Sequence, residues 1–269
     1  MGVLNVTPDS FHDGGRHFDP AHACAHVDAL LAEGADWIDI GGESTRPGSV
    51  PVPAAEQVRR IAPAIAWAVS RGAVVSVDTT SAEVAERALS MGARVINDVS
   101  CLADAALARA TAQGGGVLLL MHSREPMSTL TQYSQYPASA YTDVAADVLS
   151  EWRRARDRAL AQGMRAPDVW LDPGIGFAKN ARQSFELLER LADFTHEGVP
   201  VVVGPSRKSF ITAVGAAPTT ERLGGTIAAC LHSVDRGASV LRVHDVRAVR
   251  QALDVTRVAR DAREVAHAG

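Results

Sequence analysis

Cysteine is scarce in this sequence and lacks the spacings that would give it a structural role. Cys24, Cys101 and Cys230 are far apart and odd in number, which argues against a disulfide framework and against a zinc knuckle. No apolar run approaches the roughly 18 to 20 residues needed to cross a bilayer, and residues 1–5 lack the features of a signal peptide. We therefore expect a cytoplasmic protein.

An excess of charge of one sign is also missing. The 269 residues include 27 basic and 31 acidic side chains, a formal net charge of −4, and no basic block. Nucleic acids and anionic membrane surfaces bind to clusters of basic residues, and this sequence has none. We therefore expect neither as a partner. A hydrophobic content of 46% suits a globular protein with a sizeable core. A small soluble ligand is the default expectation.

A loose internal repeat runs along the chain: a helical stretch stops at a glycine, and a short apolar run then ends in a polar residue. Glycine tolerates the left-handed conformation just past a helix, and a short β-branched run is typical of a strand buried on both faces. The alternation predicts an α/β fold. The expected strands, from the repeat and from four further apolar runs, are residues 34–39, 72–78, 92–97, 237–242, 1–4, 117–121, 169–171 and 201–203.

Helices are expected between these strands. Several have a start signal, such as Ser81 before Ala82, where a side-chain oxygen can accept from first-turn amides. Eight alternating pairs predict a (β/α)8 TIM barrel, with a doubly wound open sheet as the alternative. No linker divides the chain, so we expect residues 1–269 to form one domain. The expected helices are residues 21–33, 54–71, 82–91, 105–113, 142–162, 184–193, 220–236 and 246–265.

Nearly every expected strand ends in a polar group. In such barrels the chemistry is assembled where strands run out into the following loops. One strand-end aspartate is more often a cap or a loop anchor, but eight polar ends would converge on one rim, which indicates a binding site. The groups at the strand ends are Asn5, Asp39, Asp78, Asn97 with Asp98, His122, Asp172, Ser206 to Lys208, and Arg242 with His244.

This expected ring has two electrostatic halves. Asp78, Asn97 and Asp172 offer acceptors and an amide, which suit the N–H edge of a polar heterocycle such as a 2-amino-4-oxo pyrimidine ring. The second half offers positively charged donors, which suit phosphate oxygens. It consists of Lys208, Arg242 and His244. The inferred ligand is a base-like ring with phosphates.

Candidates for a metal site are few. His22 and His26 stand one helical turn apart, but without an HExxH pattern they are better explained as an exposed helix face. Oxygen-rich loops favour a hard cation such as Mg²⁺, held partly by Asn5 and mostly by substrate phosphates.

Taken together, the strand-end motifs resemble those of the dihydropteroate synthase family of pterin-binding enzymes. They occur in the family's order along essentially the whole chain. The resemblance implies a (β/α)8 barrel, a homodimer, magnesium, and the joining of a pterin diphosphate to 4-aminobenzoate in folate biosynthesis. The matching motifs are MGVLNVTPDSFHDGG (1–15), GADWIDIGGESTRPG (34–48), SVDT (76–79), INDV (96–99), Met121-His122, LDPGIGF (171–177), SRKSF (206–210), GGT (224–226) and RVHD (242–245).

The resemblance also implies roles for individual residues. It places Asp78, Asn97, Asp172 and Lys208 around the pterin, and Asn5 with magnesium, Arg242 and His244 around the diphosphate. It places Thr45, Arg46, Pro47, Phe177 and Ser209 around 4-aminobenzoate. The implied catalytic residues are Asp9, which orders the closed site, with Arg46, Lys208, Arg242 and His244.

Two other functions stay open at this point. A non-catalytic pterin-binding paralogue would keep the fold and part of the site. A methyltetrahydrofolate-type methyltransferase would share the Asp/Asn/Asp ring but would need neither the SRKS nor the RVH group, and both are present at 206–209 and 242–244. The chain departs from the family pattern at His12, which replaces a serine, and at residues 123–126, which lack a glycine after the Met-His pair.

Overall fold

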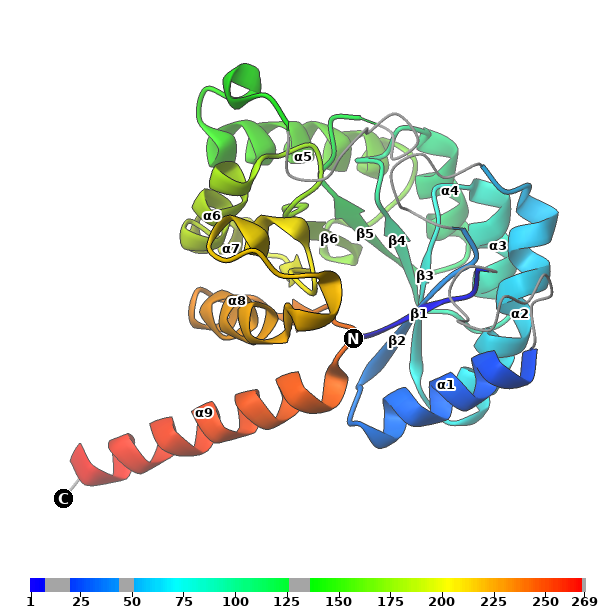
Figure 1. Cartoon of the computed structure of the whole chain (residues 1–269). Coiled ribbons are helices and arrows are strands. Elements are labelled where there is room, and N and C mark those ends of the chain that lie inside the picture. Colours follow the sequence, from blue (N-terminus) through cyan, green and yellow to red (C-terminus); the bar gives the residue numbers. More distant parts are fainter. Residues whose placement is uncertain (8–19, 44–50, 126–135, 268–269) are drawn as a thin grey trace.

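Short parallel strands form the centre of the molecule, surrounded by helices (Figure 1). The computed structural model describes residues 1–7, 20–43, 51–125 and 136–267. Eight strands lie in these ranges, one at each position expected from the sequence. They are β1 (Gly2–Asn5), β2 (Trp37–Gly41), β3 (Val74–Asp78), β4 (Val95–Asp98), β5 (Val117–Met121), β6 (Val169–Asp172), β7 (Val202–Val203) and β8 (Val240–Leu241).

The strands close into a barrel in two unequal arcs. Strands β1 to β6 form one sheet in sequence order, and β7 pairs with β8, all in parallel. Two isolated parallel bridges join the arcs: Leu171 to Val201 on one side, and Gly2 to Val243 on the other. The chain therefore adopts the (β/α)8 arrangement, and the open-sheet alternative is wrong.

The helices follow the strands and cover the outside of the barrel. Their start signals work as expected where the structure shows them: the Ser81 side chain accepts from the backbone N–H of Val84 and caps α3. The helices are α1 (Pro20–Ala32), α2 (Ala54–Ser70), α3 (Ala82–Ser90), α4 (Ala105–Gln113), α5 (Val144–Ala161), α6 (Ala181–Glu189), α7 (Ala192–Thr195), α8 (Leu223–Asp235) and α9 (Val246–His267), with short 3-10 turns at Ala138–Ala140, Ala166–Asp168, Ser209–Ala213 and Thr219–Glu221.

One expected helix differs from the prediction. Residues 184–193 were expected as a single helix, but α6 begins earlier, at Ala181, and a separate short α7 follows it. The early start has a local cause, because Asn180 and Gln183 form a reciprocal capping box. After α6, the Arg190 side chain is held by Asp143 at 2.6 Å and by Asp193 at 2.9 Å.

Two apolar cores result from this layering, besides a small cluster of Val99, Met121 and Phe177 beside the strand ends. The larger core lies between the strands and the helices and runs from Leu4 to Val249. Along each strand, residues of the smaller core alternate with residues of the larger one. Alternate side chains of a strand point to opposite faces, so the smaller core lies inside the barrel. There Trp37 and Trp170 stack with ring centroids 5.3 Å apart. The rest of this interior core is Met1, Val95, Val117, Leu119, Val202 and Val240.

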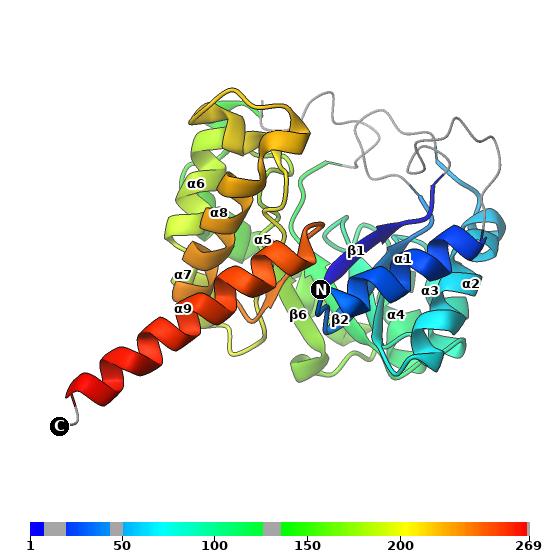
Figure 2. The same ribbon diagram turned by 60° about the horizontal axis from the view of Figure 1, so that its bottom comes forward.

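The last helix, α9, extends away from the barrel beyond α8 (Figure 2). Its first turns are anchored by the buried Val246 and Val249 and by an ion pair between Arg250 and Asp36 at 3.2 Å. Further along, Val255 and Val258 are exposed. None of the helices in the described ranges is both long and apolar enough to cross a membrane.

Candidate active site

The strand register brings the predicted acceptors to one end of the barrel. Asn5 pairs with Gly41, Gly41 with Asp78, and Asp78 with Asn97, so these positions lie level on four neighbouring strands. Asp172 is the last residue of β6, level with Met121 of β5. Residues level with one another in parallel strands point to the same face. The carboxyl ends of the strands therefore carry a wall of carboxylate and amide groups.

Arg242, which follows β8, links this wall to the opposite arc. Its Nε donates to Asp39 Oδ2 at 2.6 Å, and its Nη2 donates to Asp78 Oδ2 at 3.0 Å. The two halves that the sequence suggested are thus in direct contact. Two buried carboxylates and a half-buried guanidinium would each be costly if they stood alone.

Asp39 has a larger part in the site than the sequence analysis assigned to it. The side chain is completely buried in the layer beneath Asn97 and accepts from Ser76 Oγ at 2.5 Å and Asn97 Nδ2 at 3.2 Å, besides Arg242. In the sequence, the only indication of a role for Asp39 was its position as a polar residue at the end of an expected strand. Its partners are distant in sequence, so nothing local indicated what it holds.

Asp78 has an unsatisfied oxygen. Its Oδ1 is buried and has no hydrogen-bond partner among the described residues. Burial raises the pKa of this carboxyl group to about 7, against the opposing effect of the Arg242 guanidinium. A buried acceptor without a donor is unfavourable, so this oxygen is available to a ligand N–H.

Asp172 and Lys208 interact across the loop that follows β6. Asp172 Oδ1 accepts from the Gly174 backbone at 2.7 Å, and burial raises its pKa while the Lys208 charge opposes the rise. Lys208 Nζ donates to the Ile175 carbonyl at 2.5 Å and lies 4.0 Å from the centre of the Phe177 ring. Burial lowers the Lys208 pKa to about 7. The ammonium is thus held by a carbonyl and a ring face, close to a carboxylate.

The remaining described candidates lie on the same rim. His244 Nδ1 is 3.0 Å from Ser206 Oγ, and desolvation followed by the charges of Arg242 and Arg207 lowers the His244 pKa. Asn5 is half-buried at the end of β1, and Ser209 begins the 3-10 turn after Lys208. The four other candidates, Asp9, Thr45, Arg46 and Pro47, lie outside the described residues, as does His12.

A second cluster beside the rim contains groups for which the sequence analysis gave no role. Lys179 Nζ lies 3.0 Å from His122 Nδ1, and His122 Nε2 lies 2.8 Å from Glu151 Oε2. His122 had been noted as a polar strand end. Lys179 stands two residues past the LDPGIGF motif at 171–177, and that proximity was its only signal.

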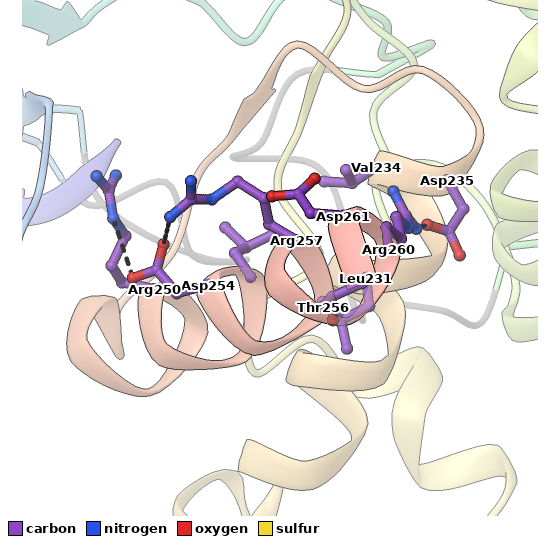
Figure 3. Close-up of a pocket in the computed structure, with 10 residues that line it drawn as sticks. Leu231, Val234, Asp235, Arg250, Asp254, Thr256, Arg257, Arg260 and Asp261 are labelled. Carbon is purple, nitrogen blue, oxygen red and sulfur yellow. Dashed lines mark hydrogen bonds and ion pairs between the residues drawn. The ribbon is translucent and has the colours of Figure 1, made fainter. Parts of the chain in front are cut away.

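The described part of the chain holds no group of three or more His, Cys, Asp or Glu side chains placed to bind a metal ion. A groove lies between α8 and α9, and none of the strand-end groups lines it (Figure 3). Its charged groups pair with one another, as Arg257 does with Asp254 at 3.5 Å and Arg260 with Asp235. The groove is lined by Leu231, Val234, Asp235, Arg250, Leu253, Asp254, Thr256, Arg257, Arg260 and Asp261.

Comparison with known families agrees with this geometry. The family described as pterin binding enzyme matches residues 1–244, which include both arcs of the barrel and every described group of the rim. The chain therefore belongs to the class of pterin-binding enzymes, and its fold is that of the class.

Individual relatives narrow the class. The dihydropteroate synthase of Mycobacterium leprae is 41% identical over 95% of this chain and 91% of its own length. A probable bifunctional folylpolyglutamate synthase/dihydropteroate synthase of Haloferax volcanii is 40% identical over 97% of this chain, which spans 30% of that protein. The Xanthomonas albilineans dihydropteroate synthase, solved with 4-aminobenzoic acid, has a TM-score of 0.88 and 39% identity, covering 97% of this chain and 92% of that one. This chain belongs to the dihydropteroate synthase family, whose members are transferases.

Proposed function

We propose that this chain condenses 6-hydroxymethyl-7,8-dihydropterin diphosphate with 4-aminobenzoate to form 7,8-dihydropteroate and diphosphate. The observation that carries the proposal is the unpartnered Asp78 Oδ1, which is buried in a wall of acceptors while the other carboxylate oxygen pairs with the half-buried Arg242. Family membership supports it, as does the 4-aminobenzoic acid bound to the Xanthomonas albilineans relative. A single site would then have to hold a ring rich in N–H groups and its phosphorylated tail.

The acceptor wall suits the pterin. Asp78, Asn97 and Asp172 line neighbouring strand ends, and a 2-amino-4-oxo ring offers them N–H donors and a carbonyl. Lys208 adds a donor opposite Asp172. Burial makes these bonds stronger than they would be in water, because the local dielectric is low. These four residues are accordingly our proposed pterin contacts.

Arg242 and His244, on the β8 side, suit the diphosphate. Arg242 is a cation paired with two carboxylates, and His244 lies at the mouth beside Ser206. Mg²⁺ would be held by Asn5 together with diphosphate oxygens. Asn5 would supply one amide oxygen, and the described residues contain no cluster of three ligating side chains. This arrangement fits an ion that takes most of its ligands from substrate and water. When bound, the ion would add positive charge at the leaving group.

The chemistry needs charge stabilisation and positioning more than it needs a base. Cleavage of the bond between the pterin methylene carbon and the diphosphate oxygen leaves positive charge on the pterin, which Asp172 and Asp78 favour, and negative charge on diphosphate, which Arg242 favours. The amine of 4-aminobenzoate then bonds to the methylene carbon and loses a proton. Phe177 and Ser209 are our proposed contacts for that substrate, with Thr45, Arg46 and Pro47.

A diphosphate-release assay tests this proposal. The purified full chain should release diphosphate from the dihydropterin diphosphate only when magnesium is present, and a sulfonamide should compete with 4-aminobenzoate. The control omits magnesium. Tight binding of a pterin without any product would instead favour the non-catalytic pterin-binding paralogue.

The wider organisation of the protein is also a proposal. We infer that residues 1–269 form one domain, supported by an apolar core that draws side chains from β1 through α9. The homodimer and the cytoplasmic location expected from the sequence remain predictions.

A further inference from the structure

Lysine is rare in this chain, and both lysines lie at the candidate site. Of the 27 basic side chains, only Lys179 and Lys208 are lysines, and the rest are arginines. Arginine is thus the default cation of this protein. An arginine fork needs room for a planar group, whereas an ammonium is compact. The two exceptions indicate positions where the compact group is required.

Lys179 is buried without a carboxylate on its amine. None of its surface is exposed, and Nζ contacts the Phe177 carbonyl at 2.9 Å, the His122 carbonyl at 3.4 Å and His122 Nδ1 at 3.0 Å. Burial lowers its pKa to about 7, opposed by the charge of Asp172. Burying an ammonium against neutral acceptors is costly, so its retention here calls for a function beyond filling space.

The contacts of Lys179 continue into an ordered chain of polar groups. Because the ammonium donates to His122 Nδ1, the other ring nitrogen carries the proton and donates to Glu151 on α5. Arg124 holds the same carboxylate with its Nη2 at 2.5 Å. His122 is thereby fixed in one tautomer and one orientation, and its carbonyl is a rigid acceptor for Lys179.

The loop after β6 packs tightly against this chain. Gly174 has a φ of +68°, and a Cβ added there would lie 2.0 Å from the His122 carbonyl oxygen and 3.3 Å from Lys179 Nζ. Such close approach leaves no space for a guanidinium. Near Lys179, Tyr141 Oη donates to the Ala178 carbonyl of the same loop at 2.9 Å. The loop is therefore held by hydrogen bonds from both Lys179 and Tyr141.

The same loop supports the other lysine. Its Ile175 carbonyl accepts from Lys208 Nζ, and its Phe177 ring lies under that ammonium. Lys179 bonds to the backbone carbonyl of Phe177, the residue whose ring Lys208 contacts. A shift of the Phe177 backbone would move both supports of Lys208.

We propose that Lys179 is a positioning residue: its ammonium holds the loop of residues 173–178 against His122, and this loop in turn sets the place of Lys208 at the pterin site. The inference rests on the proposed function for the role of Lys208. It also makes a structural claim, that the position of Lys208 depends on Lys179. This claim can be tested without measuring turnover.

The test compares Lys179→Met with Arg158→Met. Arg158, on α5, is the control because it too donates to two loop carbonyls, those of Cys101 and Leu102 after β4, although its own side chain is exposed. With a pterin as the titrated probe, Lys179→Met should weaken binding about tenfold or more, as expected when a charge-assisted bond is misplaced. Arg158→Met should bind it as the unmodified protein does, whatever its effect on thermal stability. Pterin affinity within twofold of the unmodified protein in Lys179→Met would overturn the proposal.

A second readout needs no ligand. Selective ¹⁵N labelling of lysine gives side-chain ammonium signals from these two residues alone, so Lys179→Met leaves the Lys208 signal by itself. We expect this signal to move in Lys179→Met and to stay in place in Arg158→Met. An unmoved Lys208 signal would overturn the proposal even if the chain made no dihydropteroate. Because the charges of the two lysines also interact directly, a moved signal supports the proposal only when Tyr141→Phe, which keeps both charges, moves it too.

A third variant covers the possibility that Lys179→Met does not fold. Tyr141→Phe removes the other donor to the loop and leaves both lysines in place. It should shift the Lys208 signal and weaken pterin binding by about threefold, the cost of one neutral hydrogen bond. If Tyr141→Phe folds and changes neither quantity, the loop does not set the place of Lys208 and the proposal is wrong.

Discussion

The two arcs of the barrel hold their functional groups in different ways. Along β1 to β6, strands of four or five residues pair continuously, and the register itself sets Asn5, Asp78 and Asn97 level with one another. Strands β7 and β8 have two residues each and join the rest through single bridges. There the cations depend on side-chain contacts, as Arg242 does on Asp39.

The difference has a functional meaning. A wall set by backbone hydrogen bonds is rigid and suits recognition of a flat ring with fixed donors. Cations held by ion pairs and hydrogen bonds can exchange partners. This suits the diphosphate of the substrate, which must bind, gain negative charge as its bond to the pterin breaks, and leave. The comparison therefore predicts that changes in the acceptor wall and in its cationic counterpart affect different measurable quantities.

The largest effect should come from removing one charge on either side of the site. Lys208→Ala and Asp172→Ala should each reduce turnover by about 100-fold or more, because each removes a group that stabilises developing charge or holds the ring. Diphosphate release at saturating substrate measures this. His22→Ala, on the exposed side of α1, is the control and should keep normal rates. Near-normal turnover in both site variants would refute the site assignment.

The next largest effect should be the loss of stability when Arg242 loses its ion pair with Asp39. Asp39→Asn should lower the free energy of unfolding by about 3 kcal/mol, since it takes a completely buried carboxylate out of an ion pair and leaves the half-buried Arg242 guanidinium short of a partner. The same change at the exposed Asp36, just before β2, removes a surface ion pair to Arg250 and should cost about 0.5 kcal/mol or less. Urea unfolding of both variants gives the comparison. Equal losses would show that Asp39 does not support the cationic arc.

The pH dependence of stability should show the buried state of His122. Burial and the neighbouring Lys179 charge lower the His122 pKa to about 4, whereas an unfolded histidine titrates near 6.5. The resulting stability is present above pH 6.5 and is lost as the pH falls toward 4, about 2 kcal/mol of it by pH 4.5.

His122→Gln removes this titration and should flatten the decline between pH 6.5 and 4.5. Below that window the Glu151 carboxylate also begins to contribute: burial raises its pKa, but hydrogen bonds from His122 and Arg124 outweigh that effect and lower it to about 2. The difference in unfolding free energy between the two proteins, followed across the window, isolates His122. Parallel curves for variant and unmodified protein would contradict the prediction.

The smallest effect should come from Ser206, which supports His244 at the mouth. Ser206→Ala removes the Oγ that lies near His244 Nδ1 and accepts from the His244 backbone N–H at 3.2 Å. We expect a loss of about 1 kcal/mol in stability and a rise of about threefold in the KM for the pterin diphosphate. Ser233→Ala, whose Oγ donates to the Ala229 carbonyl within α8, should leave that KM unchanged. A similar KM change in both variants would show that Ser206 does not act on the diphosphate through His244.

Much of the fold could be predicted from the sequence because its signals are local. Glycines after helices and short β-branched runs indicated all eight strands, and Ser81 acts as the expected cap. The single expected helix over 184–193 is two helices, α6 and α7, and the capping box at Asn180 accounts for the earlier start of α6. The strand-end rule also located the groups of the rim, because parallel strands deliver their carboxyl ends to one side.

The order of the strands, the chemistry at their ends and the family resemblance were all determined by the sequence alone, since periodicity and motifs depend on neighbouring residues. Only the closed barrel decided which groups meet. Asp39 and Arg242 are 203 positions apart and touch because the last strand returns to the first. Lys179, next to a recognised motif, acquired its place only when the loop after β6 folded onto His122.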